Sequence, residues 1–207
     1  MLKPSLQIFK KPIKNPRITI KTSQKIIVSV PLHFSSYHTQ AFIEYHQKWI
    51  DKTLAKISKN HQDLSDEILL HTHQILIFGQ WQDIATLSYP LQKNAFKELL
   101  YTYIAPRTQE LANTMNLDFQ HIKITNACSK FGSCTYDNRL FFSLMLVFAP
   151  YHLIDYVIIH ELAHIHHKNH SQDFWHLVTK HCLHAKDYRA QLRKEAKLYL
   201  ELLQKLS

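Results

Sequence analysis

Residues 151–165 form the part of this chain that most constrains its fold. They contain neither glycine nor proline, and Pro150 stands just before them, where a helix tolerates proline. Their apolar side chains would lie on almost every side of a helix: Leu153, Ile154, Val157, Ile158, Ile159, Leu162 and Ile165. A helix with this pattern is buried inside a protein rather than lying on its surface. The rest of the fold must therefore pack around this segment.

The same segment carries the sequence His160-Glu161-Leu162-Ala163-His164. Residues four apart share one face of a helix, so both imidazoles can bind one Zn²⁺ while Glu161 reaches a water on the metal. Buried histidines and a buried carboxylate need partners, because an uncompensated buried polar group is costly. Two hydrogen-bonded core histidines are the alternative. The full pattern favours the zinc site of a zincin-type hydrolase.

A catalytic zinc ion takes three protein ligands and leaves a fourth position to water. His167 would lie about 10 Å along the helix axis from His160, too far for one metal ion to bridge easily. His170 is the favoured third ligand if the helix ends near His167 and the chain turns back through Lys168-Asn169. Asparagine tolerates the left-handed conformation that such a turn often needs. His166 is then expected on the surface.

Two alternatives to this ligand set arise from the sequence. Glu195 and Glu201 are the glutamates that follow the helix, and either could supply a third ligand from a C-terminal helix, although less economically. The spacing from His160 to His170 also matches metzincins, which have glycine at the position of His167 and a methionine turn after the third ligand. The methionines here, Met1, Met115 and Met145, all precede the helix, which disfavours a metzincin.

Three blocks of the sequence resemble the YgjP-like metallopeptidases, relatives of the SprT-like and minigluzincin proteins. The blocks are 25–31 with 49–50, then 129–134, then 155–164 with 169–171 and 174–175. The resemblance covers nearly the whole chain and implies His160, His164 and His170 as zinc ligands, with Glu161 as the catalytic glutamate. This sequence departs from the family's usual tryptophan, asparagine and proline at three positions that bear on substrate contacts more than on the metal: Phe131, Ser143 and Lys186.

The fold class expected is α+β, a zincin-like single domain over residues 1–207 with residues 1–16 as a basic N-terminal arm. Mostly antiparallel strands are predicted at the front, in hairpins 17–22 with 25–30, 75–78 with 82–87 about Gly79, and 133–136 with 139–142, and in a strand at 119–125. Helices are predicted at 93–115, interrupted or bent at Pro106, and at 172–184 and 187–206. An amphipathic helix carries the stripe Phe42, His46, Trp49, Ile50, Leu54 and Ile57.

The predicted chemistry is hydrolysis of a peptide bond. Zinc lowers the pKa of water to about 7, and Glu161 accepts the proton and returns it to the leaving amine. An extended substrate would pair with a sheet edge, for which 139–143 is the candidate, with an ordinary core strand as the equal alternative. The sequence does not choose an oxyanion donor among His176, Tyr136, Tyr156 and Arg139.

Two further side chains have a functional and a plainer interpretation. Asp155 could orient a ligand imidazole, but capping the first turn of the helix is favoured. Cys134 could be a fourth ligand or a nucleophile, but a small buried side chain is favoured. The odd number of cysteines, with Cys128 and Cys182, indicates thiols rather than a disulfide framework.

Composition narrows the class of protein. A chain of 207 residues with 45% hydrophobic residues can bury a sizeable core. Residues 1–16 lack the apolar centre of a secretory signal, and no apolar run approaches 18 residues, so a cytoplasmic protein without a membrane partner is expected. With two glycines, Gly79 and Gly132, the chain lacks a phosphate-binding glycine loop. It carries no signal for an oligomeric state.

The charge distribution gives weaker information about partners. The formal net charge is +9, and the first 43 residues hold seven Lys or Arg and no acid. Such a segment could contact nucleic acid, but no nucleic-acid motif accompanies it, so a solvated lysine-rich surface is favoured. A protein or peptide substrate is the leading partner. A zinc-dependent nucleotide phosphohydrolase and a non-catalytic zinc-stabilised module associated with nucleic acid are the alternative functions.

Overall fold

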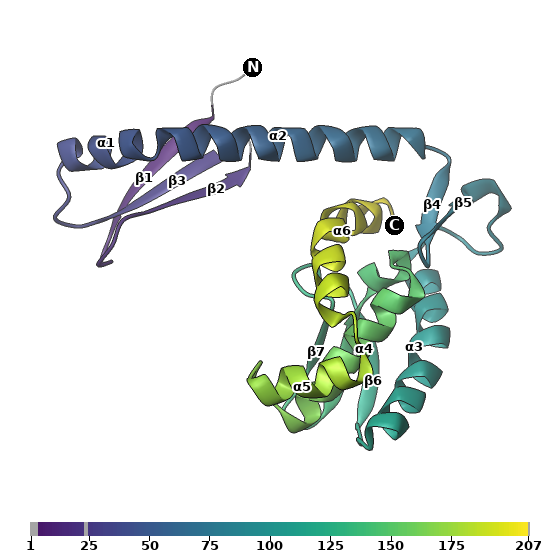
Figure 1. The fold of residues 1–207 in the computed structure, drawn as a ribbon. Coiled ribbons are helices and arrows are strands. Elements are labelled where there is room, and N and C mark those ends of the chain that lie inside the picture. The colour runs from purple at the N-terminus through teal and green to yellow at the C-terminus, as the bar shows by residue number, and fades with distance from the viewer. Residues whose placement is uncertain (1–3, 23–24, 207) are drawn as a thin grey trace. The chain divides into compact units, whose positions relative to one another are not determined.

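The computed structural model describes residues 4–22 and 25–206, which fall into two compact units with a boundary between Leu70 and His71 (Figure 1). The protein is of the predicted α+β class. The organisation of residues 1–207 as a single domain stays a prediction.

The first unit is a three-stranded sheet with two helices. Its elements are β1 (Ser5–Lys11), β2 (Arg17–Thr22), β3 (Lys25–Pro31), α1 (Ser36–Tyr45) and α2 (Gln47–Leu70). β2 and β3 form the predicted antiparallel hairpin, in which Ile18 lies opposite Val28. Because side chains alternate along a strand, β3 presents one apolar face. That face builds a core with one residue from each helix: Ile26, Val28, Val30, Ile43 and Ile50.

Two features of this unit differ from the sequence-based expectation. Strand β1 lies within the expected basic arm of residues 1–16 and pairs in parallel with β3, with Ile8 opposite Val28. The single amphipathic helix is two helices, because α1 ends at Tyr45, the backbone of His46 is not helical, and α2 begins at Gln47. Of the predicted stripe, Phe42 and Leu54 pack on the core, whereas Trp49 is 49% exposed.

The second unit combines a hairpin, a mixed sheet and the helices around the buried segment. Its strands are β4 (Gln74–Ile77), β5 (Gln80–Asp83), β6 (His121–Thr125), β7 (Gly132–Cys134) and β8 (Arg139–Ser143). Its helices are α3 (Lys93–Met115), α4 (Tyr151–His166), α5 (Gln172–His181) and α6 (Ala185–Lys205), with short 3-10 turns at Ile84–Thr86 and Leu144–Phe148. β6 is parallel and β7 antiparallel to β8, so the sheet order is β6-β8-β7.

Helix α4 is the buried helix that the sequence predicts. It packs against α3, α5, α6 and strand β7, and several of its side chains are fully buried: Leu153, Ile154, Ile158 and Leu162. The turn between β4 and β5 contacts the start of this helix. Phe78 (φ 49) and Gly79 (φ 80) both have left-handed backbones, as a two-residue type I′ turn requires. A Cβ on Gly79 would lie 2.7 Å from Cβ of Pro150, so glycine permits this contact.

Helix α3 contradicts the predicted interruption at Pro106, because it runs unbroken from Lys93 to Met115. A proline removes one backbone hydrogen bond, and the burial of the helix's apolar face outweighs that loss. The same helix is hydrogen-bonded to α4. The carboxylate of Asp155 on α4 accepts hydrogen bonds from Oη of Tyr103 (2.7 Å) and Nη2 of Arg107 (2.8 Å) on α3. Asp155 therefore neither caps α4, as favoured, nor orients a ligand imidazole. Its role is to join two helices.

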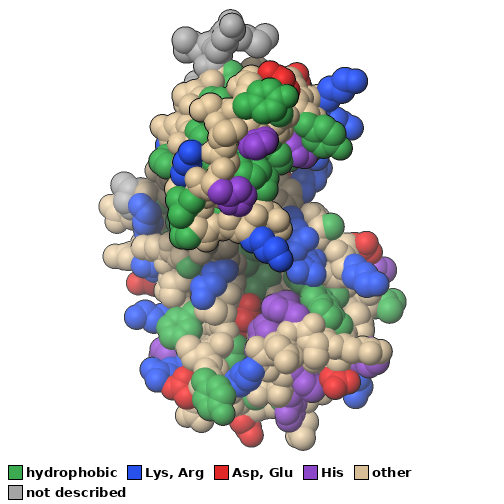
Figure 2. Space-filling view, turned by 90° about the vertical axis from the view of Figure 1, so that its left-hand side faces the viewer, with side chains coloured by type: hydrophobic (Ala, Val, Ile, Leu, Met, Phe, Trp, Pro, Cys, Tyr) green, Lys and Arg blue, Asp and Glu red, His purple; other side chains and the backbone are tan. Residues whose placement is uncertain are grey.

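One face of the molecule shows how its charged side chains are distributed (Figure 2). On the face drawn in Figure 2, Lys and Arg side chains are spread out rather than gathered in one patch, in line with the net charge of +9. Within residues 4–22 and 25–206, no helix has the length and apolar character needed to cross a bilayer.

Candidate metal centre

The two helical histidines lie where the spacing predicts. α4 continues through His160 and His164 to His166, which places the two imidazoles one turn apart with ring centroids 5.1 Å apart. Both rings are half-buried, whereas His166 is exposed, as predicted. The helix face that carries the pair is thus the one facing into the protein.

His170 lies next to this pair because helix α4 ends at His166 and the chain can turn back. His167 has extended backbone angles (φ −121, ψ 97), and the chain then turns back towards α5. The turn does not use the predicted left-handed residue, since Asn169 does not have a positive φ. Instead, the Asn169 side chain accepts a hydrogen bond from the backbone N–H of Ser171 (3.2 Å), a local turn typical of asparagine. Nε2 of His170 lies 3.1 Å from Nε2 of His160.

Neighbouring groups fix the orientation of the rings. Nδ1 of His164 lies 2.9 Å from the carbonyl oxygen of His167, and because a carbonyl only accepts, Nδ1 must donate. Nε2 of His164 is therefore the unprotonated nitrogen. Phe174 contacts all three imidazoles with ring centroids 4.5 to 4.9 Å away, and Trp175 stacks on His170. Nδ1 of His160 is buried without a hydrogen-bond partner among the described residues.

This arrangement fits a divalent metal ion. The ligand atoms of His160, His164 and His170 all lie within 4.8 Å of one another, and no other described residue belongs to the cluster. Nitrogens bound tetrahedrally to zinc at 2.0–2.1 Å are about 3.3 Å apart, close to the 3.1 Å separation of the His160 and His170 nitrogens. At this distance one ring can donate its N–H to the other, and a metal ion bound by both nitrogens would take the place of that hydrogen bond. The expected alternatives Glu195 and Glu201 are not part of the cluster.

The protonation states also suit a metal. Burial, with the positive charges of His164, His170 and Arg189, lowers the pKa of His160 to about 3. Burial likewise lowers the pKa of His164. Both imidazoles are thus uncharged at neutral pH, which is the form that binds metal.

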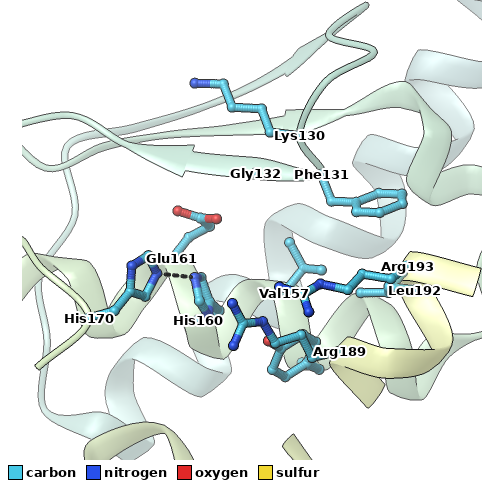
Figure 3. Close-up of a pocket in the computed structure, with 11 residues that line it drawn as sticks. Lys130, Phe131, Gly132, Val157, His160, Glu161, His170, Arg189, Leu192 and Arg193 are labelled. Carbon is cyan, nitrogen blue, oxygen red and sulfur yellow. Dashed lines mark hydrogen bonds between the residues drawn. The ribbon is translucent and has the colours of Figure 1, made fainter. Parts of the chain in front are cut away.

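Glu161 points towards strand β7, lines the same two pockets as His160 and His170, and is 5% exposed. Its carboxyl group packs against Gly132 so closely that a Cβ on that glycine would lie 2.7 Å from Oε1 (Figure 3). Burial raises the pKa of Glu161 to about 8, although the charge of Lys130 and a hydrogen bond from the Cys134 backbone lower it. A divalent cation beside the carboxylate stabilises its charged form.

The strand beside Glu161 is not the predicted one. The segment proposed as the sheet edge, 139–143, is strand β8, which lies in the middle of the sheet, so that prediction is wrong. β7 forms the edge, because it pairs with β8 on one side and has no strand partner on the other among the described residues. Gly132 was thus missed as a site residue. The signal was its position in the block 129–134, in a chain with two glycines.

The structure describes all four candidate oxyanion donors. Of these, Tyr156 is the one that lines either of the two pockets beside the histidines. Burial raises its pKa to about 12, so it keeps its hydroxyl proton. Tyr136 is 90% exposed, His176 is exposed, and Arg139 is paired with Asp137.

The cysteines are thiols, as predicted. Cys134 is half-buried on β7, and its Sγ donates to the carbonyl oxygen of Thr135 (3.3 Å). Burial raises the pKa of this thiol, and its sulfur is not part of the histidine cluster. A small packed side chain is therefore the interpretation that the structure supports.

A pocket of about 310 Å³ opens beside the histidines and Glu161. Helix α6 contributes three of its residues, Arg189, Leu192 and Arg193, and the loop before β7 contributes Lys130 and Phe131 (Figure 3). The two arginines were not predicted as site residues. They lie 19 or more positions after His170, and only the packing of α6 on α4 brings them to the site.

Comparison with known proteins bears on the same residues. The sequence matches the family model described as YgjP-like, metallopeptidase domain, over residues 14–95 and 90–195. Among solved structures, the metallopeptidase zymogen jannalysin of Methanocaldococcus jannaschii is similar at 20% identity, with 44% of this chain and 95% of that chain covered and a TM-score of 0.40. No curated protein matches the sequence. The stretch 90–195 of the family match contains all three histidines and Glu161.

Proposed function

Because the chain belongs to the YgjP-like metallopeptidase family, we propose that it hydrolyses peptide bonds with a zinc ion held by His160, His164 and His170. Glu161 is the general base in this proposal. The observation that carries it is the convergence of three ligand nitrogens within 4.8 Å, next to a carboxylate that is 5% exposed.

Each residue has a distinct part in the reaction. His160, His164 and His170 would hold the zinc ion, which when bound would supply Lewis-acid chemistry: it would lower the pKa of water to about 7 and polarise a carbonyl oxygen. The three imidazoles are uncharged donors, so they leave the positive charge of the ion uncompensated. Glu161 takes the proton of the attacking water and delivers it to the leaving amine. Gly132 holds the Glu161 carboxyl group in place, and the burial of that group keeps bulk water away from the proton transfer.

Strand β7 is the proposed binding edge for the substrate. An extended peptide adds to a sheet through the free backbone groups of an edge strand. β7 is such an edge, and it borders both the pocket beside Arg189 and a second pocket that contains Cys134 and Lys168. A peptide paired with β7 would therefore pass next to Glu161.

A phosphohydrolase acting on nucleoside triphosphates is the second candidate function. The observation in its favour is the group of cations in the pocket beside the histidines, Lys130, Arg189 and Arg193, because such residues bind phosphate oxygens. The family match favours the peptidase.

Metal removal separates these functions. We expect the purified protein to cleave unfolded casein, to lose this activity with 1,10-phenanthroline and to regain it when zinc is added back. Release of phosphate from nucleoside triphosphates, with casein left intact, would replace the peptidase by the phosphohydrolase. A chain that binds zinc but cleaves neither substrate would be the non-catalytic module.

Gly132→Ala tests the placement of Glu161. A new Cβ would lie 2.6 to 2.9 Å from three atoms of the Glu161 side chain, so the carboxyl group must move. Because a shift of about 1 Å in a catalytic group can cost about 100-fold, we expect kcat to fall at least about tenfold, with zinc content unchanged. Kinetics on casein, together with metal analysis and thermal unfolding, check this. A folded, zinc-loaded Gly132→Ala protein with full activity would contradict the assigned position.

A further inference from the structure

Two pockets adjoin the histidines, and they differ in whether their cationic side chains already have partners within the protein. The pocket that contains Cys134 also contains Lys168, whose ammonium group donates to the carbonyl oxygen of Thr135 (3.1 Å) and to Oδ1 of Asn138 (2.8 Å). Lys168 is therefore occupied by the protein itself. The other pocket contains Arg189 and Arg193, both exposed, and neither forms an ion pair with a carboxylate of the described residues.

The position of Arg189 is held by stacking. Its guanidinium group lies 5.1 Å from the ring centroid of Trp175, and Trp175 in turn stacks on His170 (centroids 5.9 Å apart, planes at 25°). A guanidinium over an aromatic face is attracted by the ring and keeps its edge free for an anion. A chain of stacked groups thus sets this charge beside the ligand histidines.

Arg193 lies four positions after Arg189 on α6, so both side chains occupy one face of the helix. Figure 3 shows both guanidinium groups directed into the pocket, towards the side where His160 and Glu161 lie. Both charges also act on Tyr156 in the pocket wall, where they lower the pKa of its hydroxyl against the effect of burial. Two unpaired, neighbouring guanidinium groups suit one carboxylate.

The other residues of the pocket indicate more closely which chemical class of ligand fits it. Phe131, Val157 and Leu192 supply apolar walls, and Val157 and Leu192 are buried. A short aliphatic stem that ends in a negative charge matches apolar walls with a cationic end. A phosphate group by itself would meet the same charges but would leave the apolar walls without a partner.

We propose that Arg189 and Arg193 form a carboxylate subsite, which selects peptides with an acidic group beside the scissile bond. The proposal rests on the peptidase function above and specifies its substrate class. The carboxylate comes either from a Glu or Asp side chain or from the free C-terminus of the substrate.

Matched peptides test the subsite. Quenched fluorescent peptides of one sequence carry Glu or Gln at each of two positions on either side of the cleaved bond, and each is made with a free or an amidated C-terminus. We expect the wild type to prefer one acidic form at least about tenfold in kcat/KM. The double variant R189Q/R193Q should bring this ratio close to one, while Lys194→Gln, on the same helix but outside the pocket lining, should leave it unchanged. The position or terminus that carries the preference identifies the source of the carboxylate.

Charge reversal gives an independent test. Because both arginines are exposed, R189E/R193E should fold and should favour a Lys-containing peptide over its Glu counterpart. A wild type without any acidic preference, or a ratio that survives in both double variants, would overturn the subsite. So would an equal loss on acidic and neutral peptides, since that outcome would give the arginines a structural or catalytic role.

Peptide binding to the Glu161→Gln protein separates this proposal from the peptidase function. Fluorescence anisotropy on this variant reports affinity without turnover, and we expect tighter binding of the acidic peptide that depends on Arg189 and Arg193. If this holds but the wild type cleaves no peptide, the peptidase function fails and the subsite stands. Arginine-dependent binding of a nucleoside triphosphate without discrimination between the peptides would overturn the subsite in favour of phosphate.

Discussion

Glu161→Gln is expected to reduce kcat on unfolded casein by about 10² to 10⁴-fold while zinc stays bound. The amide is nearly the same size as the carboxyl group, so it fits beside Gly132 as the native side chain does. It cannot accept a proton from water, and the three histidine nitrogens remain in place because they come from other residues. Steady-state kinetics and zinc analysis on the same protein sample measure both effects.

Glu98→Gln is the matched control, because Glu98 is exposed on α3 and does not line either pocket beside the histidines. It removes the same charge from the protein and should not change kcat. A zinc-loaded Glu161→Gln protein as active as this control would remove Glu161 from the reaction, whatever the metal contributes.

His164→Ala is expected to abolish zinc binding at micromolar zinc and to lower peptidase activity on the order of 10³-fold. Two histidines on separate segments hold a metal ion far less tightly than three. The loss should also appear in stability. A ligand at 100 times its Kd stabilises the folded protein by about 2.7 kcal/mol, or about 5–10 °C in Tm for a chain of this size. Zinc should therefore raise the Tm of the wild type but not of His164→Ala.

His166→Ala controls for the removal of a histidine from the same helix. His166 is two residues away, exposed and outside the cluster, so zinc binding and the zinc-dependent rise in Tm should persist. Thermal unfolding with and without added zinc makes the comparison. If zinc raised the Tm of His164→Ala as much as that of His166→Ala, zinc would bind somewhere other than at His164.

The cluster of His160, His164 and His170 was largely predictable from the sequence because its information is local. His160, Glu161 and His164 lie within two turns of one helix, and the apolar residues of that segment predict a buried helix. His170 follows from the end of the helix, which depends on a few neighbouring residues. Helix periodicity and turn chemistry act over such short spans, so the four residues could be named and the third ligand ranked above Glu195 and Glu201.

What could not be predicted depends on contacts between distant segments. β1 has no turn that joins it directly to β3, since β2 lies between them in the chain, and its parallel pairing leaves no local signature. The order β6-β8-β7 likewise puts 139–143 at the centre of the sheet rather than at its edge. Arg189 and Arg193 reach the pocket because α6 packs on α4. Neither residue stands in a pattern that marks it beforehand.

X-ray absorption spectroscopy of the purified, metal-loaded protein identifies the atoms bound to the metal ion. We expect one zinc ion per chain, with three imidazole nitrogens at about 2.0–2.1 Å, one further light ligand and no sulfur. His164→Ala treated with the same micromolar zinc should retain no zinc ion with this three-imidazole signature. A zinc ion bound through sulfur, or protein that takes up no transition metal while correctly folded, would contradict the proposed centre of His160, His164 and His170.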